Sequence, residues 1–488
     1  MKSIKQNAIL NIVYTITNIL FPLVTFPYVS RVLSAEGIGK VSLFTSIANY
    51  AIMFAALGIS TYGIRATAKV RNDKKQLSQI VFELVVINLV ATLVVIGLLA
   101  IISLYVPKLN REPELLIINA VLIFSSALGF NWLYSGLEQY SFITIRSLFF
   151  KIIALIFTFA LVKNRDDYII YAGITAFSSV GSYIINFIYA RKFILFPQIS
   201  KLKFKRHFKP MIYLFASILA VSIYTNLDTI MLGFIRDDTE VGLYTIAVKV
   251  KWLLLNVINA ISAVLLPRLS FYASEKKMDE FNNILKKSIS TIFMIALPLT
   301  LFFIVEAKET ILIIGGKDYL GAVYCMQITM PILLISSISN ITGNQILIPM
   351  GYDSYFMRAV ILGAGVDVCL NIILMPNIGC MGAAVATLVA EAVQLFMQYL
   401  YSREYLVKNI NSATLFKILK SAFGAIAIVC ILKKYIIWNL IGNMFVLTVI
   451  YFGIYYLLLL LFREPLIKEY TFDILKKINL KKRTNSID

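Results

Sequence analysis

Charged residues are scarce in this chain of 488 residues: only 15% are Asp, Glu, Lys or Arg, whereas water-soluble domains carry about a quarter. Hydrophobic residues make up 59% and the mean hydropathy is +0.81. This composition excludes the soluble globular, disordered and nucleic-acid-binding classes. The formal charge of +20 therefore does not indicate a nucleic-acid partner, because Lys and Arg of membrane proteins gather on cytoplasmic loops.

Histidine, cysteine and long polar loops are also rare. The single histidine, His207, lies in the longest loop, residues 191–210, and is interpreted as an exposed loop residue in a basic segment that touches anionic lipid. The four cysteines lack the spacing of metal ligands and are interpreted as buried small hydrophobes. No loop exceeds about twenty residues and no D-x-D motif occurs, so we expect no glycosyltransferase, polymerase or ligase, and no enzyme.

Long uncharged runs dominate what is present, and a membrane-spanning helix needs roughly 20 apolar residues. Backbone polar groups in lipid must be satisfied internally, and the alternation of a β-barrel is absent from the sequence. The predicted fold is an all-α polytopic membrane protein. We expect about 14 spans, near residues 7–30, 41–64, 84–107, 115–137, 145–162, 168–190, 211–235, 241–267, 288–305, 319–350, 356–377, 380–401, 412–432 and 437–462.

Lys and Arg are distributed unequally between alternate loops, with about three times as many on the side that carries both termini. Both termini are therefore predicted to be cytoplasmic, and the N-terminal segment is interpreted as an uncleaved first span.

An internal repeat is indicated by similar sequences after spans 1 and 7. Arg31 to Gly39 precedes a span that ends at Arg65, and Arg236 to Gly242 precedes one that ends at Arg268. We expect two six-helix lobes, 1–195 and 196–410, then helices 13 and 14 in 411–465 and a cytoplasmic tail in 466–488.

Several short sequence segments resemble those of a known family. They are Phe21-Pro-Leu-Val-Thr-Phe-Pro-Tyr-Val-Ser-Arg31, Asn226-Leu-Asp228-Thr-Ile-Met-Leu-Gly233, Leu266-Pro-Arg268 and Gln345-Ile-Leu-Ile-Pro349-Met-Gly351. With two six-helix lobes and a terminal pair, the chain resembles Wzx-type flippases of lipid-linked oligosaccharides, in the multidrug/oligosaccharidyl-lipid/polysaccharide exporter superfamily. The resemblance implies a bacterial inner-membrane protein that moves an undecaprenyl-pyrophosphate-linked repeat unit outward by alternating access. It implies membrane lipids, a polysaccharide polymerase and glycosyltransferases as partners, and no nucleic acid.

Ionisable residues inside spans are costly and usually face a cavity or a partner. Asp228 and Lys249 lie about 10 and 12 Å deep and could pair, and Lys251 lies deeper on another face. One interpretation is that Asp228 and Lys249 form an ion pair that stabilises the helix bundle. The other is a cationic substrate site formed by Arg31, Arg65, Lys249, Lys251 and Arg268, together with Asp228.

A second set of ionisable residues lies in the C-terminal lobe, where Asp367 and Glu391 are each about 16 Å from the start of their helix. Asn371 follows Asp367 by four residues, and Thr387 precedes Glu391 by four. These residues could hold a coupling ion, H⁺ or Na⁺, or simply be neutral carboxyls that hydrogen-bond to neighbouring helices. No other cofactor and no metal centre are expected.

Two alternative functions remain open: a multidrug/toxin cation antiporter of the same superfamily, and a lipid II flippase. Fourteen helices and a basic first lobe argue against the antiporter. Helix 1 lacks charge before Arg31, where the lipid II subfamily carries a basic residue deeper in the helix.

Overall fold

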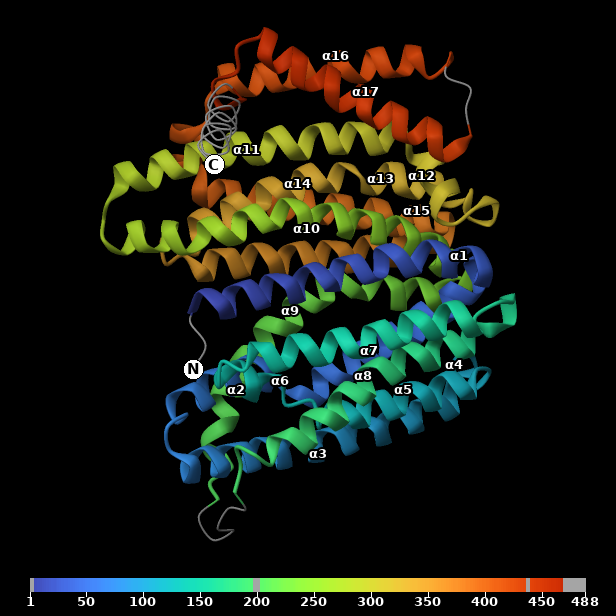
Figure 1. Ribbon diagram of the computed structural model, residues 1–488, viewed down its shortest axis with the longest axis vertical. Helices are drawn as coiled ribbons and strands as arrows, with labels where there is room; N and C mark the ends of the chain where they lie inside the picture. Colours follow the sequence, from blue (N-terminus) through green and yellow to red (C-terminus); the bar gives the residue numbers. More distant parts are fainter. Residues whose placement is uncertain (1–3, 196–201, 436–438, 468–488) are drawn as a thin grey trace, which may run out of the picture. The chain divides into compact units, whose positions relative to one another are not determined.

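The computed structural model describes residues 4–195, 202–435 and 439–467, and in these ranges the regular structure is entirely helical (Figure 1). Eleven of the described helices are long and apolar enough to cross a membrane. Two of them, α1 (Ile4–Ala56) and α15 (Asp353–Asn409), are each divided by non-helical residues, at Ser34 and at Ile378–Gly379. With α9 (Lys205–Ile235) as a further long helix, the number is compatible with the predicted 14. The all-α membrane fold is thus confirmed.

The remaining helices coincide with the uncharged runs of the sequence, but some runs contain breaks in the helix that the sequence does not predict. Span 2 is interrupted at Leu57–Gly58, where both residues have positive φ, and span 4 at residues 127–130. Span 10 consists of three pieces. The helices are α2 (Ile59–Lys69), α3 (Lys74–Tyr105), α4 (Pro107–Asn110), α5 (Pro113–Ser126), α6 (Asn131–Gly136), α7 (Tyr140–Leu161), η1 (Arg165–Asp167), α8 (Tyr168–Ala190), α10 (Asp238–Ser274), α11 (Met278–Val305), α12 (Ala307–Ile314), η3 (Lys317–Tyr319), α13 (Ala322–Thr329), α14 (Pro331–Asn340), η4 (Ile341–Leu347), α16 (Ser412–Leu432) and α17 (Leu440–Leu461).

The chain forms two compact units. The first consists of Met1–Thr245 with two short segments, Ile314–Asp318 and Met375–Cys380, and the second contains the rest. The predicted lobe boundary at residue 195 and the predicted tail remain predictions, and most of residues 466–488 lie outside the described ranges.

In the first unit, a buried cluster joins α2, α3, α6, α7 and the start of α9, with Leu84, Leu133 and Tyr134 fully buried. The outer faces of the helices carry large exposed apolar residues such as Val90, Leu98 and Ile156. A face of this kind suits the hydrocarbon of a bilayer, because lipid tails are as apolar as leucine.

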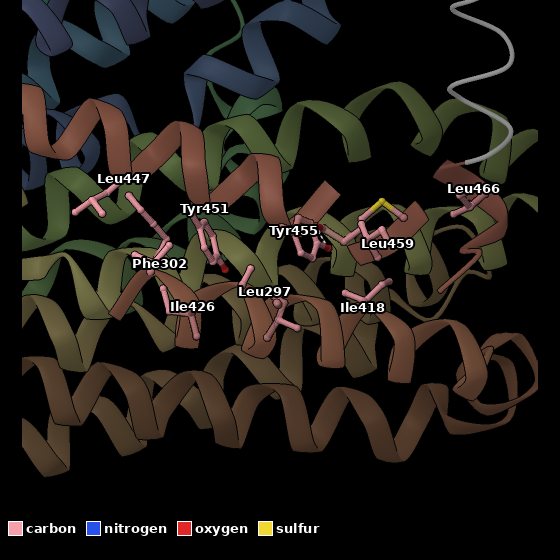
Figure 2. Packing of buried hydrophobic residues seen from close by; sticks show 13 residues of the cluster. Leu297, Phe302, Ile418, Ile426, Leu447, Tyr451, Tyr455, Leu459 and Leu466 are labelled. Atoms are coloured by element: carbon pink, nitrogen blue, oxygen red, sulfur yellow. Dashed lines mark hydrogen bonds between the residues drawn. The ribbon is translucent and has the colours of Figure 1, made fainter. Parts of the chain in front are cut away.

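In the second unit, the C-terminal helices α16 and α17 pack against α11 through a continuous apolar cluster (Figure 2). Phe302 of α11 stacks on Tyr451 of α17, with ring centroids 5.2 Å apart. At one end of this contact Lys433 lies 3.0 Å from Glu306 and 2.9 Å from Glu309. Burial raises the pKa of Glu306 and Lys433 opposes that shift. The C-terminal helices α16 and α17 are therefore held against α11 by apolar packing and by the ion cluster around Lys433.

Candidate functional site

The acids predicted to hold a coupling ion are buried in the second unit. Asp367 and Asn371 lie on the first half of α15 and are fully buried, and Glu391 on its second half is 7% exposed. The two halves are distinct helices because Gly379 adopts φ +54°, a conformation that side-chain-bearing residues rarely adopt. Burial of the three residues agrees with a position inside the helix bundle, and their role in ion coupling stays a prediction.

On α15 the pair Thr387 and Glu391, which the sequence indicated, is part of a longer stripe of buried polar residues. Thr387, Glu391, Gln394, Gln398 and Ser402 are all buried, and their spacing of four, three, four and four places them on one face of the helix. At 1.5 Å per residue the stripe is about 22 Å long, most of the thickness of a bilayer core. The spacing alone could have revealed it, because a buried membrane helix otherwise has no reason to repeat polar residues on one face.

The stripe continues onto α14 and η4. The Gln398 side-chain oxygen accepts hydrogen bonds from Ser339 at 2.9 Å and from Thr342 at 2.7 Å, and Gln394 donates to Ser339 at 3.1 Å. Thr342 lies in η4, a π-helical segment, and such segments are frequent at functional sites. Farther along η4, Gln345 accepts from Ser288 at 2.6 Å and donates to Ser262 at 2.9 Å.

In the first unit, Asp228 of α9 is 4% exposed and accepts a hydrogen bond of 2.5 Å from the hydroxyl of Tyr244 on α10. The sequence indicated Lys249 as a partner of Asp228 by its depth, and the structure shows that Tyr244, four residues after Glu240, donates to this carboxylate. Lys249 and Lys251 belong to the second unit, and both are half-buried. The Asp228–Lys249 pair and the roles of these residues in substrate binding stay predictions.

The three arginines predicted to contact substrate are exposed. Arg31 lies just before the Ser34 break of α1, Arg65 lies on α2, and Arg268 lies near the end of α10. Arg65 is one of the residues that line a cavity of about 720 Å³ in the first unit.

His207 is not the exposed loop residue that the sequence suggested. It lies in the first turn of α9, is 1% exposed, and its Nε2 is 2.5 Å from the carboxylate of Glu83 on α3. Burial lowers the pKa of His207, and the neighbouring Glu83 opposes that shift. The prediction failed because its partner lies 124 residues earlier in the chain. The cysteine interpretation was also wrong in part, since Cys325 and Cys380 are buried but Cys369 and Cys430 are exposed.

The two glycine motifs that indicated the repeat pack directly against each other within the first unit. A Cβ on Gly39 would lie 1.6 Å from the carbonyl oxygen of Asp238, and one on Gly242 would lie 1.9 Å from that of Ala35. Around this backbone contact, Lys108 pairs with Asp238 at 2.9 Å. Glycine at both positions is therefore required for α1 and α10 to approach this closely.

Comparisons with known proteins agree with these features. Residues 4–273 match the family described as polysaccharide biosynthesis protein. The putative O-antigen transporter of Escherichia coli (strain K12) is 24% identical over 405 residues, which cover 82% of this chain and 97% of that protein.

Two solved structures share the fold. A lipid II flippase, MurJ, in an inward closed conformation has a TM-score of 0.63 at 16% identity and covers 92% of this chain and 100% of its own. An inward-facing multidrug resistance transporter of the MATE family has a TM-score of 0.62 at 14% identity, with 80% and 94% covered. Both the resemblance seen in the sequence and the multi-pass membrane architecture are thus confirmed, and the chain belongs to the polysaccharide biosynthesis protein family.

Proposed function

We propose that the protein is a flippase that moves an undecaprenyl-pyrophosphate-linked oligosaccharide from the cytoplasmic to the outer leaflet of a bacterial inner membrane. The observation that carries the proposal is family membership over more than half of the chain, joined to a named O-antigen transporter that is similar along nearly its whole length. Buried polar groups in the spans support transport, because such groups are costly in a bilayer and mark substrate or ion pathways.

In this proposal the cations Arg31, Arg65, Lys249, Lys251 and Arg268 attract the pyrophosphate of the substrate. Guanidinium and ammonium groups form charge-assisted hydrogen bonds with phosphate oxygens, and arginine can do so with two bonds at once. Asp228 modulates the charge of this site. Both termini would lie in the cytoplasm, where glycosyltransferases supply the lipid-linked oligosaccharide.

A deletion strain tests the function directly. Loss of the gene should cause lipid-linked oligosaccharide to accumulate in the cytoplasmic leaflet, and the intact gene should reverse this. Arg31→Ala, Lys249→Ala and Arg268→Ala should each impair export at unchanged membrane abundance. Wild-type export in all three variants would remove the cationic site. Absence of accumulation in the deletion strain would instead favour the drug antiporter.

Ion coupling is proposed at Asp367, Asn371 and Glu391, supported by their burial and by the polar stripe on α15. Carboxylate, amide and hydroxyl oxygens suit a proton or a hard cation such as Na⁺. Glu391→Gln and Asp367→Asn should reduce flux driven by a pH or Na⁺ gradient by about tenfold or more, because each substitution removes an ionisable ligand. Glu404→Gln, at an exposed acid of the same helix, is the control. Unchanged gradient-driven flux in both test variants would contradict this assignment.

A lipid II flippase is the second candidate, because that structure shares the fold over most of both chains. Supplying purified lipid II and an undecaprenyl-pyrophosphate oligosaccharide separately to reconstituted protein would discriminate the two substrates.

A further inference from the structure

One cavity in the first unit is lined by basic residues. It has a volume of about 720 Å³ and lies between α2, the N-terminal end of α9 and α3. Four cationic side chains reach it, Arg65 and Lys69 from α2 and Arg206 and Lys209 from α9. Residues four or three apart share a helix face, so each helix presents a pair of cations to the same space. The four positive charges repel one another unless an anion binds between them.

The wall of the cavity is fixed by a buried carboxylate. Glu83 is fully buried and accepts hydrogen bonds from the Arg206 guanidinium at 2.7 Å and from the Lys203 backbone N–H at 2.6 Å, besides its contact with His207. The Tyr62 hydroxyl lies 2.8 Å from Nδ1 of His207. The first turn of α9 is thereby joined to both α2 and α3, and the cavity is formed before any ligand arrives.

Arg206 is therefore neutralised by Glu83, but the other three cations are not. Arg65, Lys69 and Lys209 are exposed and form no ion pair with an acid in the described part of the chain. A cavity with three uncompensated cations on a rigid wall has the charge and the donors that a phosphate group needs.

Apolar residues complete the cavity and indicate a lipid rather than a soluble anion. Val70, Ile80 and Leu214 line it, and the neighbouring Ile212 and Tyr213 are 56% and 77% exposed. Large apolar side chains with that exposure suit contact with hydrocarbon. The same space thus offers cations to a head group and an apolar surface to the chain attached to it.

We propose that this cavity binds the phosphate or pyrophosphate of an anionic lipid at the end of the first unit where the Lys and Arg bias predicts cytoplasm. It deepens the proposed function, on which it rests, by assigning Lys69 and Lys209, with Arg65, to first capture of the pyrophosphate. The same chemistry is offered by a bulk lipid such as phosphatidylglycerol, so the experiment must separate the two sources.

The test uses the purified full-length protein in detergent and counts bound lipid by native mass spectrometry during titration. The probes are undecaprenyl pyrophosphate, phosphatidylglycerol and inorganic pyrophosphate. The test variant is Arg65→Gln/Lys69→Gln/Lys209→Gln. The control Lys74→Gln/Lys75→Gln/Lys408→Gln removes the same charge from exposed lysines that do not line the cavity. A variant with Arg65→Lys and Lys209→Arg keeps the charge and should keep binding.

The test variant should bind undecaprenyl pyrophosphate at least about tenfold more weakly, because it loses three charge-assisted contacts with the pyrophosphate, and the control should bind normally. An equal loss for phosphatidylglycerol would support the cavity with bulk lipid as its occupant. Unchanged affinity for both lipids in the test variant, or a loss confined to inorganic pyrophosphate, would overturn the proposal.

These outcomes separate the cavity from the proposed function. If the wild-type protein binds phosphatidylglycerol through the three cations but does not bind undecaprenyl pyrophosphate, the cavity stands and the substrate proposal fails. If the wild-type protein binds undecaprenyl pyrophosphate and the test variant binds both lipids as well as the wild type does, the cavity fails and the substrate proposal stands.

Discussion

Pro298 lies inside α11, where its ring nitrogen cannot donate to the carbonyl oxygen of Met294 four residues earlier. The hydroxyl of Tyr455, on α17, donates to that oxygen at 2.9 Å, as Figure 2 shows. The neighbouring Tyr451 hydroxyl donates to the carbonyl oxygen of Pro298 at 3.1 Å. A membrane interior offers no water to an orphan carbonyl, so the appended helix supplies the bond that proline removes.

Tyr455→Phe should therefore destabilise the protein by about 1–3 kcal/mol, the cost of leaving a buried polar group unsatisfied. In Pro298→Ala the backbone N–H of residue 298 can donate to Met294, and the added Tyr455→Phe change should then cost little. Thermal unfolding of the four proteins of this double-mutant cycle in detergent measures the coupling. If Tyr455→Phe lowers the free energy of unfolding equally in both backgrounds, the Tyr455 hydroxyl does not compensate for the hydrogen bond that Pro298 removes from the Met294 carbonyl.

The contact between α1 and α10 depends on glycine on both helices. Gly39→Ala would place a Cβ 1.6 Å from the Asp238 carbonyl oxygen, which no side-chain movement can relieve. We expect this variant to hold the two helices apart and to lower lipid-linked oligosaccharide export by about tenfold or more, with abundance unchanged.

The measurement combines export with thiol labelling of Ile38→Cys in a background in which the four native cysteines are replaced. Ile38 is 2% exposed when the contact is formed. Labelling should increase in the Gly39→Ala background. Gly97→Ala is the matched control, because no atom lies within 4 Å of a Cβ added there. If Ile38→Cys is labelled equally slowly with and without the Gly39→Ala change, the helices accommodate the added methyl group. The close contact then does not depend on glycine at position 39.

The sequence predicts those features of the fold that depend on local composition. The uncharged runs place the spans, and the repeated glycine motifs at Gly39 and Gly242 identify two segments that the structure packs together. Periodicity does not reveal partners from distant helices. Glu83 and His207 are separated by 124 residues, and Tyr455 lies 161 residues from the carbonyl oxygen that it satisfies.

Orientation in the bilayer follows from charge and can be tested on the complete chain. About three times more Lys and Arg lie on the side of the termini, so the loop between α10 and α11 should be cytoplasmic and the end of α4 should face outward. Cysteines at Glu275 and Asn110, both exposed, report on the two sides.

The labelling needs a background in which all four native cysteines are replaced, because Cys369 and Cys430 are exposed and would react. A membrane-impermeant maleimide should label Asn110→Cys severalfold faster than Glu275→Cys in intact spheroplasts, and both equally after permeabilisation. The opposite order would place the termini outside. The basic cavity beside Arg65 would then face away from the leaflet in which lipid-linked oligosaccharides are assembled, so this experiment also decides whether first capture can occur there.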